Sequence, residues 1–159
     1  MTSTTTLLAT TCTIGTATIG GVFLAFSSFV MPALGRLSSS AAVSSMQSIN
    51  ITAITPVFMT ALFGTAALCV AGGWRAVASW GSPAAPWLLA GCAAYLVGVV
   101  GVTAVANVPL NDRLAVLDPA SASAATQWAD YLVTWTRWNH VRTVAGIASA
   151  VAFLVARSR

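Results

Sequence analysis

The segment RWNHVRT, residues 137–143, gathers strong hydrogen-bonding side chains in a chain that is otherwise poor in polar groups. It contains Asn139, the only histidine, His140, and Arg142. Histidine can accept or release a proton near neutral pH, and arginine and asparagine can stabilise a developing oxyanion. The segment therefore predicts a general base at His140, with Arg142 and Asn139 as oxyanion donors. On a helix Asn139 aligns with Arg142, whereas His140 lies further around.

A second polar segment, NVPLNDR at residues 107–113, supplies similar side chains. Asn107 and Asn111 are four residues apart and would share one face of a helix. Pro109 lies between them and disturbs the backbone hydrogen bonding there. Arg113 ends the segment. We predict that Asn107, Asn111 and Arg113 complete the catalytic site that RWNHVRT begins.

The composition places these residues in a membrane protein. The chain has 159 residues, of which 57% are hydrophobic and 6% charged, and its mean hydropathy is +0.84. A water-facing surface needs roughly a quarter to a third of charged residues, so most of this exterior must face a lipid bilayer. The net charge is +4, but no run of basic residues could form a nucleic-acid surface.

Four apolar stretches are long enough to cross a bilayer core as helices, which takes about 20 residues. They cover approximately residues 7–34, 51–73, 87–108 and 140–156. We predict an all-α fold, a single transmembrane domain over residues 1–159 that forms a four-helix bundle. Small residues four apart, such as Ala17 with Gly21 and Ala94 with Gly98, would let the helices pack closely.

An extra amphipathic helix is predicted between the third and fourth spans, over approximately residues 119–136. Asp118 and Pro119 suit a helix start, and aromatic residues then recur at helical spacing. Because Trp and Tyr favour the lipid–water boundary, these aromatics either only anchor the helix or also cover a flat substrate. The candidate substrate-binding residues are Trp128, Tyr131, Trp135, Trp138 and, at the start of the second span, Asn50.

An alternating bundle brings four span ends to one membrane face: the ends of spans one and three and the starts of spans two and four. The polar candidates come from these ends, so we expect one polar site above an apolar bundle. Arg142 lies in an apolar segment, where arginine costs at least about 2.5 kcal/mol near the helix centre. We expect Asp112 or Asp130 as its partner. In the competing interpretation Arg142 reaches the headgroups, and Asn107 and Asn111 only join helices.

The remaining reactive residues predict no metal site. Cys12, Cys69 and Cys92 fall inside apolar spans without metal-ligand spacing and are expected to be small apolar fillers. The chain has one histidine, no glutamate and no carboxylate pair at ligand spacing. No cofactor is expected. Haem with His140 as axial ligand is the alternative, because one imidazole is enough.

The segments NVPLNDRLA at 107–115 and WTRWNHVRTVAG at 135–146, in a four-span protein of this size, resemble the anthrone oxygenase-like family of small membrane proteins. The resemblance covers essentially the whole chain. For the characterised fungal members it implies oxidation of anthrones to anthraquinones with molecular oxygen, whereas most bacterial members have no assigned activity. It implies a small aromatic, anthrone-like or other phenolic substrate and oxygen as partners.

The residues fit this chemistry. Removing an anthrone's methylene proton gives an aromatic, phenolate-like anion, so a neutral His140 would suffice as base. Arg142, Arg113, Asn111 or Asn139 would stabilise the oxyanion, and the electron-rich anion can react with oxygen directly.

Other functions stay open. In a non-catalytic membrane scaffold, His140 and Arg142 would serve stability alone, and a homo-oligomer is compatible with the sequence. A transporter is disfavoured, because the chain shows no inverted repeat and no charged relay. Arg157 and Arg159 directly follow the last span, which favours cytoplasmic termini in a bacterial plasma membrane.

Overall fold

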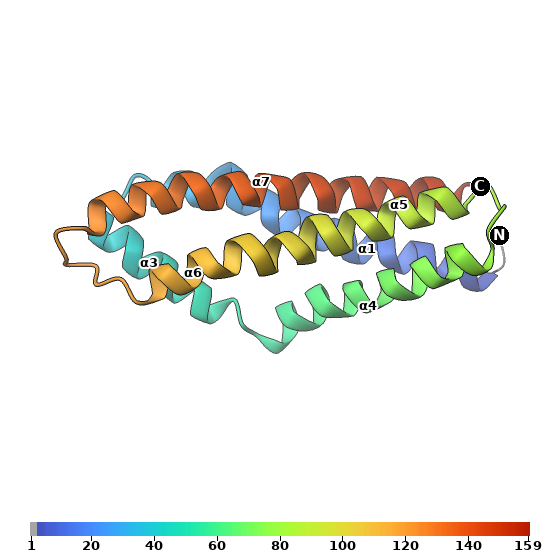
Figure 1. Ribbon diagram of the computed structural model, residues 1–159, viewed down its shortest axis with the longest axis horizontal. Coiled ribbons are helices and arrows are strands. Elements are labelled where there is room, and N and C mark those ends of the chain that lie inside the picture. Colours follow the sequence, from blue (N-terminus) through green and yellow to red (C-terminus); the bar gives the residue numbers. More distant parts are fainter. Residues whose placement is uncertain (1–2) are drawn as a thin grey trace.

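The computed structural model describes residues 3–159, and all regular structure in that range is helical. Four long helical rods lie side by side, and the start of the first and the end of the last meet at one end (Figure 1). The four spans are Ser3–Leu34, Pro56–Ala78, Ala85–Ala115 and Ala124–Arg157. All four are long and apolar enough to cross a membrane. The predicted membrane helical bundle is therefore confirmed.

The first and third spans each contain wide π-helical turns. The first span consists of α1 (Ser3–Ala25), η1 (Phe26–Val30) and α2 (Met31–Leu34). The third span consists of α5 (Ala85–Tyr95), η2 (Leu96–Gly101), η3 (Thr103–Asn107) and α6 (Val108–Ala115). Such turns are frequent at functional sites, and η1 and η3 both lie toward the end of the bundle opposite the termini.

The extra helix lies elsewhere than predicted. It is α3 (Ser39–Thr52), between the first and second spans. Residues 124–136, expected to form a separate surface helix, are the first turns of the 34-residue α7 (Ala124–Arg157). No proline or glycine interrupts α7 before Gly146, so the helix continues without a break. The prediction of a separate helix over 119–136 was wrong.

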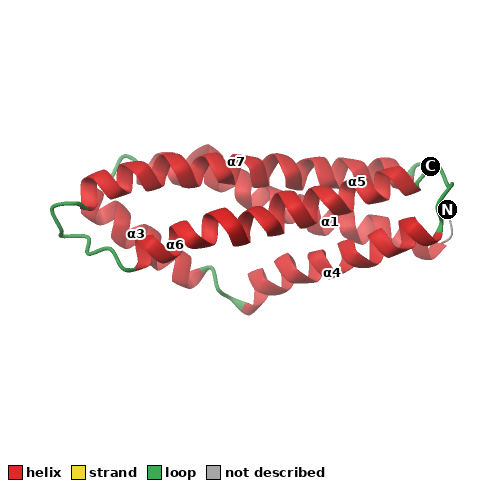
Figure 2. Cartoon of the chain, in the orientation of Figure 1, coloured by secondary structure: helices red, strands yellow, loops and turns green. Residues whose placement is uncertain are grey.

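The second span also starts later than predicted. Residues 51 and 52 still belong to α3, and α4 (Pro56–Ala78) begins after a short connection (Figure 2). Thr55 caps α4, because its Oγ1 accepts a hydrogen bond from the Phe58 backbone N–H at 3.2 Å. Pro56 then fits the first turn, where no backbone donor is needed.

Helices α1 and α7 approach closely through two glycines. A Cβ atom on Gly146 would lie 2.9 Å from the Cα of Gly20. Gly21, predicted from its spacing to be a packing residue, has no neighbour within 4 Å of such an atom. The predicted role of Gly98 is confirmed, because a Cβ there would lie 2.5 Å from Ala145 Cβ.

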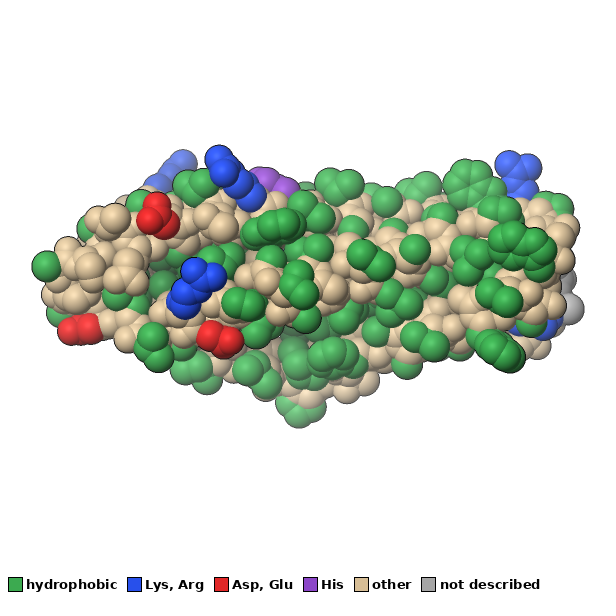
Figure 3. Space-filling model, viewed as in Figure 1, with side chains coloured by type: hydrophobic (Ala, Val, Ile, Leu, Met, Phe, Trp, Pro, Cys, Tyr) green, Lys and Arg blue, Asp and Glu red, His purple; other side chains and the backbone are tan. Residues whose placement is uncertain are grey.

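The surface agrees with a membrane location. Hydrophobic side chains cover the middle of the molecule, and charged side chains lie toward its two ends (Figure 3). The three cysteines are buried, as expected, and carry free thiols. The apolar core containing them lies in the half nearer the termini, whereas a second cluster with Trp128, Tyr131 and Trp135 packs at the opposite end.

Candidate active-site cavity

A cavity of about 740 Å³ lies between α1, η1, α3, α4, η3, α6 and α7. Its walls are mostly apolar and include the rings of Phe23, Phe26 and Phe58. The polar side chains that line it are those of Gln47, Asn50, Thr52, Thr55, Thr103, Asn111, Asp112 and Arg142. This volume and this apolar character are typical of sites for small organic molecules.

Arg142 lies in the wall of this cavity and is only 4% exposed. Its guanidinium group stacks over two rings, with Cζ 4.1 Å from the centroid of Phe23 and 5.0 Å from that of Trp135. Nη2 donates a hydrogen bond to Asn139 Oδ1 at 2.8 Å, and Nη1 donates one to Thr103 Oγ1 at 3.3 Å. These contacts fix the plane of the guanidinium.

The expected carboxylate partner of Arg142 is absent from its contacts. Within residues 3–159, neither Asp112 nor Asp130 forms an ion pair with it. Asp112 lines the same cavity, but its side chain is exposed. The prediction of an ion pair was wrong, because neutral oxygens and aromatic rings surround the guanidinium instead. A buried cation without a counter-ion is costly.

Two buried donors in the cavity wall have no partner. They are Nε of Arg142 and Nδ2 of Asn50. Leaving such a donor unsatisfied costs about 1–3 kcal/mol, and more for a charged group. Both nitrogens are enclosed by protein atoms, in residues that line the cavity.

Asn139 holds Arg142 in place. Its side chain is fully buried, and Nδ2 donates to the Phe23 backbone oxygen and to Ser27 Oγ, both at 2.8 Å. Its Oδ1 accepts from Arg142. Asn139 thereby joins α7 to α1 and η1 and orients the guanidinium group.

The substitution Asn139→Ala is expected to lower the free energy of unfolding by about 3 kcal/mol, because it removes three hydrogen bonds and leaves a charged donor unpaired. Unfolding titrations in sodium dodecyl sulfate measure this change. Ser28→Ala is the control, since Ser28 Oγ bonds only to the Leu24 backbone oxygen of its own helix. Equal stability of the two variants would contradict the role of Asn139.

Asn111 organises the aromatic residues. Its Oδ1 accepts hydrogen bonds from Tyr131 Oη at 2.9 Å and from Trp135 Nε1 at 2.8 Å. Trp128, Tyr131 and Trp135 are buried and stacked along α7, with centroid distances of 5.6 and 6.4 Å. They form core rather than a surface helix. Of these three, Trp135 lines the cavity.

The other predicted site residues lie outside the cavity lining. Asn107 is buried, and its Nδ2 donates to the Trp135 backbone oxygen at 3.3 Å. Arg113 is exposed, and its Nε donates to the Pro109 backbone oxygen. Trp138 is 42% exposed. Asn107 therefore supports α7 behind the cavity, whereas Arg113 and Trp138 face outward.

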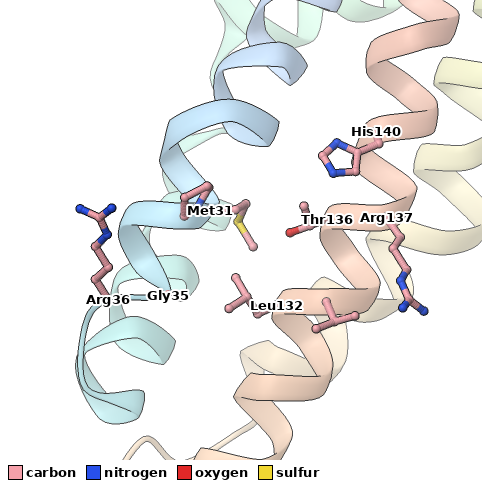
Figure 4. A pocket seen from close by; sticks show the side chains of 9 residues that line it. Met31, Gly35, Arg36, Leu132, Thr136, Arg137 and His140 are labelled. Atoms are coloured by element: carbon pink, nitrogen blue, oxygen red, sulfur yellow. The ribbon is translucent and has the colours of Figure 1, made fainter.

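His140 lies in a separate groove between the first span and α7 (Figure 4). Its side chain is exposed, and its Nδ1 is 2.9 Å from Ser27 Oγ. Because Ser27 Oγ also accepts from Asn139, one serine links His140 to the residue that orients Arg142. His140 itself does not line the large cavity.

Several cavity residues escaped sequence reasoning. Thr103 and Phe23 lie within apolar runs, and their identities carry no signal of function. Spacing offers one clue, because Thr103 precedes Asn107 by four residues and shares its helix face. Gln47 was expected at this polar end of the bundle, but not as a residue that joins two helices. It fixes α3 to the end of α6 by donating to the backbone oxygens of Leu114 and Leu117, at 2.8 and 2.9 Å.

A comparison with protein families agrees with this architecture. The family model described as anthrone oxygenase matches residues 55–152, which is more than half of the chain. The chain belongs to the anthrone oxygenase family. The resemblance inferred from its two polar segments is thereby confirmed. Membership in the anthrone oxygenase family suggests an oxygenase-type function in the membrane.

The matched region contains most polar residues of the site, including Thr103, Asn111, Asp112, Asn139 and Arg142. The cavity walls contributed by α1, η1 and α3 precede it. Searches of curated proteins and of solved structures give no significant match.

Proposed function

We propose that this chain is a membrane-embedded oxygenase that oxidises a hydroxylated, anthrone-type aromatic substrate with molecular oxygen inside the large cavity. One observation carries the proposal: Arg142 is buried in the cavity wall without a carboxylate partner and with Nε unsatisfied. The family to which the chain belongs supports the choice of an oxygenation reaction.

In this proposal the substrate ring lies against the apolar cavity wall, near the rings of Phe23 and Phe26. Its oxygen accepts hydrogen bonds from the side chains of Arg142 and Asn50, which line the cavity and each have a donor without a partner. Charge-assisted hydrogen bonds are about twice as strong as neutral ones. Because the oxygen becomes more negative when the neighbouring methylene loses a proton, these donors stabilise the anion more than the neutral substrate.

Asp112 is the proposed proton acceptor, since it is the carboxylate that lines the cavity. His140 was expected to act as the base, but it lies in a separate groove and does not line the cavity. We therefore assign His140 a positioning role: it bonds to Ser27, which in turn accepts from Asn139.

The reaction consumes one oxygen molecule for each substrate. Asp112 takes the first methylene proton, and the carbanion forms a carbon–oxygen bond with O₂. The distal oxygen is protonated to give a hydroperoxide. Loss of the second proton from the same carbon then breaks the O–O bond, forms the new carbonyl and releases water. The substrate loses two hydrogens and gains one oxygen atom.

Oxygen uptake by the detergent-purified protein tests this proposal directly. With an anthrone as probe, we expect uptake and quinone formation in a one-to-one ratio. An absorption spectrum of the same sample distinguishes the cofactor-free proposal from the haem alternative. If His140 binds haem, the wild-type protein shows a Soret band, and the substitution His140→Ala shifts it. A colourless protein that takes up no oxygen with any anthrone or phenol would support a non-catalytic scaffold instead.

Replacing Asp112 by asparagine is expected to lower kcat with the anthrone probe by at least about a hundredfold, because the cavity loses its base. Stopped-flow formation of the quinone measures the change. Asp130→Asn is the matched control, since Asp130 is an exposed carboxylate outside the cavity lining. If both variants retain the wild-type kcat, proton transfer to Asp112 is not part of the reaction.

A further inference from the structure

The large cavity opens at one side of the bundle. Most residues of its lining are buried or half-buried, but one group of them is exposed. This group consists of residues 51–54, at the end of α3 and in its connection to α4, and of Val108, Asp112 and Ala115 in α6. Among the described residues, no exposed lining residue belongs to α1, η1 or α7. The mouth of the cavity therefore lies between the α3–α4 connection and α6.

Little packing closes this mouth. Helix α4 packs against α1, α5 and η2, whereas α6 packs against η3, α3 and α7. Within residues 3–159, α4 and α6 form no extensive contact with each other. No residue from 51 to 61 is buried, and the connection protrudes from the side of the bundle (Figure 1). A segment with few buried contacts moves at low free-energy cost, so it can make room for a molecule that passes between it and α6.

Helix α7 shows where the membrane interfaces lie. Arg137 and Arg157 are 20 residues apart on this unbroken helix. At 1.5 Å per residue this separation is about 30 Å, the thickness of the hydrocarbon core. With Arg157 at one interface, Arg137 lies at the other. Arg142, which lines the cavity, is then about 8 Å inside the bilayer.

The α6 side of the mouth lies at the level of Arg137. Two hydrogen bonds fix the third span against α7, one to Asn111 on the water side of that level and one to Thr103 on its bilayer side. Val108 lies between these two residues along the chain, so it is near the interface, whereas Asp112 lies on the water side.

The connection reaches the same interface. Arg75, near the end of α4, donates to Thr5 Oγ1 at the end of the bundle that holds the termini. Pro56 precedes Arg75 by 19 residues, which is about 29 Å along α4. The neighbouring Ile51 and Ile54 are 76% and 73% exposed, and hydrophobic side chains cover the protruding connection (Figure 3). Exposed apolar patches of this kind are typical of membrane contacts.

We infer that the substrate of the proposed oxygenase is dissolved in the bilayer and enters the cavity laterally, between the α3–α4 connection and α6. The inference rests on the proposed function for the nature of the ligand, whereas the position of the mouth does not depend on it. The mouth favours an amphiphilic aromatic molecule: the ring passes the side chains of Ile54 and Val108, and the polar group stays at the water side with Asp112. Amphipathic rings prefer the lipid–water boundary, as those of Trp and Tyr do. A substrate attached to a large water-soluble group would not follow this route.

Spin labels test where the mouth opens and require no turnover. The variants Ile54→Cys and Val108→Cys carry a methanethiosulfonate nitroxide in vesicles of dioleoylphosphatidylcholine. The three native cysteines are buried, so wild type should stay unlabelled. The measured quantity is the ratio of label collisions with oxygen, which concentrates in hydrocarbon, to collisions with nickel(II) ethylenediaminediacetate, which stays in water.

Two exposed valines calibrate this ratio. Val70→Cys lies within the second span, where the native side chain is 59% exposed, and Val116→Cys follows α6, where it is 88% exposed. We expect the ratios at Ile54→Cys and Val108→Cys to be nearer to that of Val70→Cys than to that of Val116→Cys, because the mouth faces lipid.

A large ring at the mouth tests substrate entry. With an anthrone dissolved in the same vesicles, Val108→Trp should lower kcat/KM on the order of tenfold, because it obstructs access to the cavity. Val105→Trp is the matched control, since Val105 is exposed on the same span but lies outside the cavity lining. It should keep the wild-type kcat/KM.

Two results would overturn the inference. Labels at Ile54 and Val108 with the collision ratio of Val116→Cys would show that the mouth opens to water, and equal kcat/KM in the two tryptophan variants would show that substrate does not pass Val108. A wild-type protein without oxygen uptake would count against the proposed function alone, because the collision ratios would still show whether the cavity opens to lipid.

Discussion

Arg142→Met is expected to lower kcat for the oxidation of an anthrone on the order of a thousandfold, while the protein stays folded with an equal or higher Tm. Loss of a single oxyanion donor costs about a hundredfold to a thousandfold, and here the lost group also carries the positive charge of the cavity wall. The Tm, in contrast, is expected to stay the same or to rise. A buried charge without a counter-ion is costly, and we expect removal of this cost to offset the loss of the hydrogen bond to Asn139 Oδ1.

A loss of kcat without a loss of Tm distinguishes a catalytic role of Arg142 from a structural one. Arg157→Met is the control for removing an arginine from α7, because Arg157 is exposed at the far end of the helix. It should leave kcat unchanged. Oxygen uptake measures turnover, and thermal unfolding in detergent measures Tm. If Arg142→Met keeps its turnover but loses stability, Arg142 is a structural residue and the proposed oxyanion site is wrong.

The number of spans could be predicted from hydropathy alone, because lipid accepts only long apolar helices here. The 14-residue length of α3 could not be predicted, since its Ser-rich sequence carries no strong apolar period. It forms because Ser38 caps it, accepting from the Ala41 backbone N–H, and because its own side chains Val43 and Met46 are buried in the core. Tertiary packing of this kind cannot be read from local composition.

The site was predicted in part. Asn139 and Arg142 are three residues apart and meet on one helix face, as the spacing predicts. His140 and Arg142 are two residues apart, which places them about 200° apart around the helix. Their proximity in the sequence suggested one site, but the helix directs them to different surfaces. The large cavity also depends on where α3 and α4 join, at residues 53–55. Thr55 and Pro56 form a helix-start signal there, but the continuous apolar run from residue 51 led to a span predicted to begin before it.

Gly146→Leu is expected to prevent the bundle from forming. The backbones of α1 and α7 meet at Gly146 and Gly20, and even a single Cβ on Gly146 would lie 2.9 Å from a backbone carbon of the other helix. A backbone atom cannot rotate away as a side chain can, so the whole of α7 must move. Lipid provides no hydrophobic drive for helix association, so the stability lost with this close contact is not replaced.

The loss of stability caused by alanine at three glycines should then depend on the space around each glycine. Gly146→Ala should be the most destabilising, by at least about 1–3 kcal/mol, as in other overpacked cores. Gly20→Ala should cost less, because its added Cβ would lie 3.2 Å from the backbone of α7. Gly21→Ala should be neutral or stabilising, since nothing lies within 4 Å and alanine favours a helix. Unfolding in sodium dodecyl sulfate measures all three.

The same contact controls the proposed chemistry. Gly146 lies one turn of α7 beyond Arg142, and Gly20 lies close before Phe23 on α1. Separating the helices there would lengthen the 2.8 Å hydrogen bond from Asn139 to the Phe23 backbone oxygen and shift the ring on which the guanidinium stacks. Gly146→Ala should therefore lose oxygen uptake in addition to stability, whereas Gly21→Ala should lose neither. Full turnover in a destabilised Gly146→Ala would show that the α1–α7 spacing does not position Arg142.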